Sequence, residues 1–137
     1  MNKNRYFLAT LAVFVATFVL DIVINNVILA KLYLATASLW RPMEEMQRLI
    51  PWSFLVYVVT ALVFTYMYAK GYEGKPSRIG EGMRFGLLIG LLTSLPMAVM
   101  CYITMPIPSA LAWGGFLTGM GEFALLGIVA GLVYHKA

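Results

Sequence analysis

The fold is decided by the stretch Trp113–Tyr134, WGGFLTGMGEFALLGIVAGLVY. At 1.5 Å per residue a helix of this length covers ~33 Å, enough to cross the ~30 Å hydrocarbon core of a bilayer. Small residues recur in it at four-residue spacing, which lets another helix approach closely; the two pairs are Gly115/Gly119 and Gly127/Gly131. The stretch therefore predicts a membrane span with a face for helix packing.

Glu122, near the middle of this stretch, is its only acidic or basic side chain. A charged carboxyl at the centre of a span costs ~2.5–3.5 kcal/mol on insertion scales, so intramembrane acids face protein or a cavity. We expect Glu122 to face other helices.

Composition extends this reading to the whole chain. Of 137 residues, 61% are hydrophobic and 12% are charged, whereas soluble domains carry about 25% charged residues. The mean hydropathy is +0.83. One His and one Cys supply little for the common hydrolytic or redox chemistries, so we expect no enzyme and no cofactor. The single Cys also permits no internal disulfide.

The chain thus predicts one all-α membrane domain, residues 1–137, with four spans in a bundle. The expected spans cover about residues 6–30, 52–69, 83–105 and 110–134. Between the first two, an apolar stripe opposite several charges predicts a short amphipathic helix in the interface, over about residues 41–50. Trp40 and Trp52 bracket it, as aromatic rings do at the headgroup level.

The ten basic residues lie almost entirely in the connecting segments, which indicates membrane orientation rather than a nucleic-acid surface. One side of the four-span arrangement holds Lys3, Arg5, Lys70, Lys75, Arg78, Arg84 and Lys136. The other side holds Lys31, Arg41 and Arg48. The positive-inside rule therefore predicts both termini in the cytoplasm.

The third span begins with small residues at every fourth position, which predicts a groove for a neighbouring helix; these are Gly82, Gly86, Gly90, Ser94 and Ala98. The uncharged link Met105–Ser109 predicts a tight return into the fourth span, as an antiparallel hairpin. Pro96 removes one backbone hydrogen bond and predicts a kink.

Two acids inside spans, Asp21 and Glu122, are the candidate polar site. Asn25 lies one turn after Asp21 on the same face. These residues either hydrogen-bond neighbouring helices or bind a proton or cation. In a straight bundle the two acids differ by ~10 Å in depth, from the rise per residue, which disfavours a shared metal site.

A soft metal site is a further alternative in the third span. Thioether and thiolate groups of the kind that hold Cu(I) recur at helical spacing, at Met97, Met100, Cys101 and Met105. The chain has nine Met residues, however, and Met commonly fills gaps in packed cores. We therefore predict no metal.

Several short motifs carry a resemblance. They are Tyr33, Thr36-Ala37, Leu39-Trp40-Arg41-Pro42, Glu45-Met46, Ile79-Gly80-Glu81-Gly82, Arg84-Phe85-Gly86 and Met105-Pro106-Ile107-Pro108. With these motifs the chain resembles an uncharacterised group of small bacterial four-helix integral membrane proteins. The resemblance implies a bacterial inner-membrane location and lends no catalytic or binding residue.

Two functions stay open. The sequence favours the first, a structural or accessory subunit that binds lipid or a larger membrane assembly, because the chain is small, has abundant close-packing surface and has few reactive groups. The second is a small oligomeric transporter or channel that uses Glu122 and Asp21 as proton- or cation-linked groups. A fully hydrogen-bonded Glu122 favours the first, and a Glu122 that faces a hydrated cavity favours the second.

Overall fold

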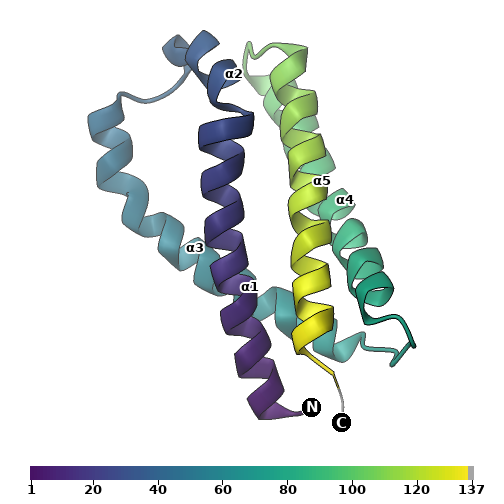
Figure 1. Ribbon diagram of the computed structural model, residues 1–137. Helices are drawn as coiled ribbons and strands as arrows, with labels where there is room; N and C mark the ends of the chain where they lie inside the picture. The colour runs from purple at the N-terminus through teal and green to yellow at the C-terminus, as the bar shows by residue number, and fades with distance from the viewer. Residues whose placement is uncertain (136–137) are drawn as a thin grey trace.

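A computed structural model describes residues 1–135, and every regular element in that range is helical (Figure 1). Lys136, used above to predict orientation, lies outside the described residues. Four long helices are present: α1 (Lys3–Val23), α3 (Met43–Lys70), α4 (Arg78–Thr104) and α5 (Ser109–Val133). Three short elements join α1 to α3: the π-helix η1 (Ile24–Ile28), α2 (Ala30–Ala35) and the 3₁₀ turn η2 (Ala37–Leu39). The all-helical prediction with four long apolar helices is confirmed, since all four, α1 continuing into η1, are long and apolar enough to cross a membrane.

The helices α4 and α5 form the closest pair, an antiparallel hairpin closed by the link before Ser109 (Figure 1). Their backbones touch where both helices present glycine. A Cβ atom added to Gly82 or Gly86 would overlap the carbonyl oxygen of Gly127 or Phe123. This contact depends on the absence of side chains, because Cβ atoms would force the two backbones apart.

Most of the small residues noted in the sequence lie in this contact between α4 and α5, and Gly115 does not. Those that face the partner helix are Gly82, Gly86, Gly90, Ser94, Gly119, Gly127 and Gly131. Gly115 has no atom within 4 Å of an added Cβ and takes no part in the packing. Pro96 lies inside α4, which continues as one helix through it.

Helix α1 packs against both α3 and α5, and the buried core lies where all four long helices meet near the two termini. Its largest fully buried side chains are Tyr68, Tyr134 and Leu126. The start of α1 and the end of α5 lie together at this end of the molecule, whereas the other end is more open (Figure 1). We call these the core end and the open end.

The separate amphipathic helix expected over residues 41–50 is not found. Residues 43–50 instead form the first two turns of α3, which runs without interruption through Pro51. A proline inside a helix removes one hydrogen bond, and membrane helices tolerate that loss. From the core end, α3 leans away from α1 toward the open end (Figure 1).

The π-helix η1 after α1 has a local cause in two neighbouring Asn residues. The amide of Asn25 donates to the carbonyl oxygen of Asp21 at 2.9 Å, and Asn26 donates to Ile22 at 2.9 Å. These side chains compete for backbone acceptors, and the backbone N–H of Leu29 bonds Ile24, five residues back, at 2.8 Å. The wider turn ends α1 and starts the irregular segment that leads to α3.

Candidate functional site

Asp21 lies in the last turn of α1 and is half-buried. Its carboxylate accepts a short hydrogen bond from the hydroxyl of Tyr57 on α3. It also accepts one from the side-chain amide of Asn25, at 2.9 Å. Both carboxylate oxygens therefore have a donor from within the chain.

The polar contacts continue beyond Asp21 into the irregular segment. The hydroxyl of Tyr33 on α2 donates to the side-chain oxygen of Asn25 at 3.1 Å. Burial, and to a lesser degree the charge of Asp21, raises the pKa of Tyr33. The Tyr33 hydroxyl therefore stays protonated at neutral pH and remains the donor. Tyr57, Asp21, Asn25 and Tyr33 form one chain of hydrogen bonds, which we call the Asp21 network.

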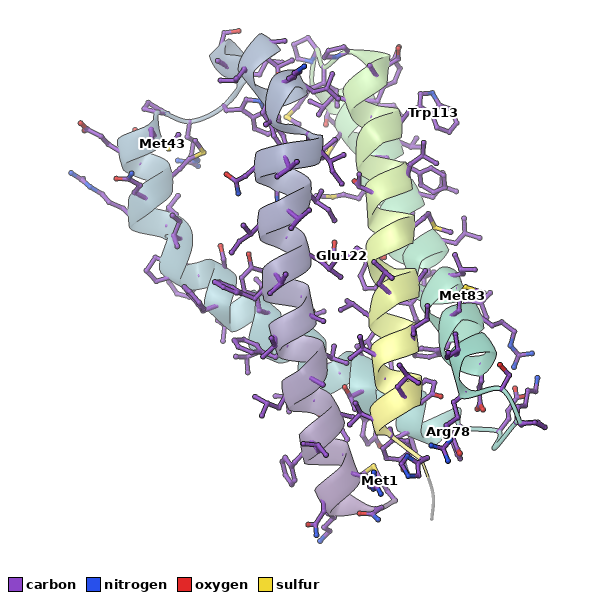
Figure 2. All side chains as sticks on the ribbon, viewed as in Figure 1. Met1, Met43, Arg78, Met83, Trp113 and Glu122 are labelled. Carbon is purple, nitrogen blue, oxygen red and sulfur yellow. The ribbon has the colours of Figure 1, made fainter. Side chains whose placement is uncertain are left out.

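Glu122 lies on α5, half-buried, on the side of the helix that faces α1 (Figure 2). It makes no hydrogen bond with any residue in the described range 1–135, and it interacts electrostatically with Asp21 and with Tyr57. The ion pairs within that range join Arg41 to Glu45 and Glu73 to Lys75 and Arg84, so neither Asp21 nor Glu122 has a basic partner there. The candidate site is therefore a pair of carboxyl groups, one with donors and one without.

The sequence disfavours a metal site shared by Asp21 and Glu122, because the two acids lie at different depths along their helices. The structure brings Asp21 and Glu122 within electrostatic range of each other across the gap between α1 and α5. Within the described residues, however, no third His, Cys, Asp or Glu joins them in a cluster that could hold a metal ion. Two carboxyl groups without a basic partner can hold a proton or a positive charge, but they are too few to coordinate a metal ion tightly.

A cavity of about 540 Å³ lies at the open end, between the irregular segment and the hairpin of α4 and α5. One wall is fixed by Trp40, whose indole N–H donates to Thr36 at 2.9 Å and whose ring packs edge-on against Tyr33. The lining is mostly apolar: Leu29, Tyr33, Trp40, Thr93, Ser94, Met97, Ala98, Cys101, Met105, Ile107, Leu111, Ala112, Gly115 and Phe123.

Three of the four sulfur residues noted in the sequence line this cavity. Met97 and Cys101 lie at four-residue spacing on one face of α4, and Met105 is the extended residue directly after the helix. Met100 is not part of the lining and is 55% exposed. The structure thus places the sulfur atoms of these three residues as part of an apolar wall.

The position of His135 near the C-terminus, outside the apolar spans, predicts a solvated side chain. The structure instead has it half-buried after the end of α5, and its Nδ1 atom is buried without a hydrogen-bond partner among the described residues. Burial, followed by the charges of Arg5 at the start of α1 and Arg78 at the start of α4, lowers the pKa of His135.

Sequence reasoning missed two members of the Asp21 network, Tyr57 and Tyr33. Tyr57 is one of few polar side chains in an apolar span, which was its only signal. It also missed Glu81, which is 5% exposed and accepts hydrogen bonds from the backbone N–H groups of Glu73 and Lys75. The roles of these three residues depend on contacts with residues that are distant in the sequence or lie across a loop, so the sequence alone does not show them.

Comparison with known proteins adds no relative: no family model, curated protein or solved structure matches this chain. The resemblance to small bacterial four-helix membrane proteins therefore remains an expectation from the sequence motifs.

Proposed function

We propose that this chain is a multi-pass protein of a bacterial inner membrane that moves protons or a cation, with Asp21 and Glu122 as the charge-binding groups. The observation that supports this most is the unequal pair of carboxyl groups. Asp21 has two donors, whereas Glu122 has no hydrogen bond to residues 1–135. Acids of this kind inside spans are costly and commonly mark ion or proton paths.

The inequality supports exchange rather than a purely structural role. A structural carboxyl in an apolar setting is stable when donors satisfy its oxygens, as they do at Asp21. At Glu122 no residue in the range 1–135 supplies such a donor, so a charged Glu122 has no hydrogen bond from within the described chain. Glu122 is thus the group that would gain and lose a proton or cation, and Asp21 the fixed charge beside it.

The proposed arrangement places both termini in the cytoplasm, lipid around the four helices, and more than one copy in the working unit. The excess of basic residues at the core end supports the orientation. The outer half of α3 supports assembly, because it leans away from α1 (Figure 1) and leaves large side chains uncovered, with Trp52 67% and Val56 59% exposed.

Proton flux into vesicles tests the proposal. Purified protein is reconstituted with a pH-sensitive dye inside, and a potassium gradient with valinomycin drives the flux. We expect Glu122→Gln to lower the flux at least ~10-fold, since an amide cannot exchange a proton. Glu44→Gln is the matched control, because Glu44 is exposed and makes no hydrogen bond or ion pair with the described residues. Equal flux in wild type and Glu122→Gln would contradict the role of Glu122.

The second candidate is an accessory subunit that binds lipid or a larger membrane assembly, and the uncovered outer half of α3 favours it. Its test is the mass of the protein extracted from its membrane in mild detergent, with partners identified. A stoichiometric complex with another protein, together with no proton flux in vesicles, would favour this function over transport. A homo-oligomer with flux would favour transport.

A further inference from the structure

We propose that the cavity at the open end binds a lipophilic organic cation whose positive charge is held by Asp21 and Glu122. This inference rests on the proposed function and names the class of its substrate. It is carried by the position of the cavity relative to the two acids, by its lining and by the charge of the site.

Neither acid lines the cavity, and both lie further toward the core end along the helices that form it. On α5, the lining residue Gly115 precedes Glu122 by seven positions, so the two lie on one face and two turns apart. On the other side, Leu29 lines the cavity, and Asn25 and Asp21 follow one and two turns toward the core end. Both acids therefore lie about two turns, ~10 Å, from these lining residues, and their charge acts on a molecule in the cavity from its core-end side.

A direct link also joins the cavity wall to the Asp21 network. Tyr33 lines the cavity and at the same time donates a hydrogen bond to Asn25, which in turn donates to Asp21. The wall that contacts the body of a ligand and the acid that attracts its charge are therefore held together. This arrangement favours a ligand with an apolar body and a charge at one side.

The lining suits such a body. Its volume of about 540 Å³ lies in the range of small-molecule sites, ~300–1,000 Å³. Aromatic rings of Tyr33, Trp40 and Phe123 face it, and aromatic faces attract cations. The thioethers of Met97 and Met105 add soft, polarizable contacts that adapt to different shapes.

Charge decides between a cation and a neutral apolar molecule. Neither Asp21 nor Glu122 has a basic partner among residues 1–135. A neutral alkyl chain would fill the cavity and leave the two carboxyl groups unpaired. An organic cation would supply the missing positive charge in a setting of low dielectric, where the attraction is strong.

Binding of tetraphenylphosphonium to the full chain in detergent, measured by calorimetry, tests the inference. We expect Glu122→Gln to weaken binding at least ~10-fold, and Glu122→Asp, which keeps the charge, to weaken it less. Trp40→Ala should weaken it ~5-fold through loss of the aromatic wall. The matched control Glu44→Gln, on the exposed start of α3, should stay within about twofold of wild type.

The neutral probe triphenylphosphine oxide separates the outcomes. If it binds as tightly as the cation, and Glu122→Gln changes neither, the cavity is a plain apolar site and the inference is overturned. Glu122-dependent proton flux without cation binding would overturn the inference and leave the proposed function standing. Charge-dependent binding without any proton flux would keep the binding site and overturn the proposed function. Elution of each variant as a single species in size-exclusion chromatography verifies its fold.

Discussion

At the scale of single residues, this chain satisfies its buried and half-buried carboxyl groups to different degrees. Glu81, 5% exposed, accepts hydrogen bonds from the backbone N–H groups of Glu73 at 2.6 Å and Lys75 at 3.0 Å. It thereby holds the loop that joins α3 to α4. Glu122, in contrast, makes no hydrogen bond within residues 1–135. The first group has the surroundings of a structural acid and the second those of a reactive one.

Substitution of Glu81 by Gln should therefore destabilise the protein. One carboxylate oxygen becomes an NH₂ group that points at a backbone N–H, and a buried donor left without its acceptor costs ~1–3 kcal/mol. We expect a lower midpoint of thermal unfolding in detergent and faster amide exchange at Glu73 and Lys75.

Glu44→Gln serves as the control for this prediction too, because Glu44 is exposed at the start of α3. An unchanged midpoint in Glu81→Gln, equal to that of Glu44→Gln, would show that the two backbone contacts contribute nothing to stability.

The loop that Glu81 holds also carries surface charge pairs. Glu73 contacts Lys75 and Arg84 at 2.6 Å each, and these hydrogen bonds lower the pKa of the Glu73 carboxyl. Because Glu73 is exposed, the pairs contribute little to stability. The stability that these pairs contribute is fully present at pH values above the ordinary carboxyl pKa. It is lost as the pH falls through the lowered pKa of Glu73.

At the scale of elements, the hairpin of α4 and α5 depends on backbone contact. Gly86→Ala would place a Cβ atom against the carbonyl oxygen of Phe123, in the helix backbone itself. The helices must then move apart, which we expect to cost ~1–3 kcal/mol, as overpacking does in other cores. The unfolding midpoint in detergent measures this loss.

Gly121→Ala is the matched control, because an added Cβ there meets no atom within 4 Å. This variant should be neutral or more stable by up to ~1 kcal/mol, since Ala favours helix over Gly. If both substitutions had the same effect on the midpoint, helix propensity rather than close contact would account for stability at Gly86.

The elements also show what sequence reasoning reaches. Long apolar runs predicted the four long helices, because length and hydropathy are local properties. The break at Pro51 was predicted wrongly, since nothing local tells whether a helix tolerates one missing hydrogen bond. The same limit applies to the candidate site. Asp21 and Glu122 stand out in the sequence as acids in apolar runs, whereas Tyr57 becomes a partner of Asp21 only when α3 packs on α1.

At the scale of the whole molecule, the two ends of the bundle differ. The buried aromatic core and both chain ends lie at the core end, and the cavity lies at the open end, with Asp21 and Glu122 between them (Figures 1 and 2). A closed core end and a cavity at the open end fit the proposal of a protein that receives its ligand from one side of the membrane. The side depends on orientation, which is the remaining prediction.

Cysteine labelling in whole cells measures that orientation. In a Cys101→Ser background, single cysteines replace Asn4, Pro76 and Ser38, all exposed. The first two lie at the core end and Ser38 at the open end. We expect a membrane-impermeant maleimide to label Ser38→Cys in intact cells and the other two only after lysis, because basic residues concentrate at the core end. Reversed labelling would contradict the cytoplasmic termini and move the cavity to the cytoplasmic side. Asn4 precedes the first span and Pro76 follows the second, so both should be labelled from the same side. If they were labelled from different sides, the first two spans would not return the chain to its starting side.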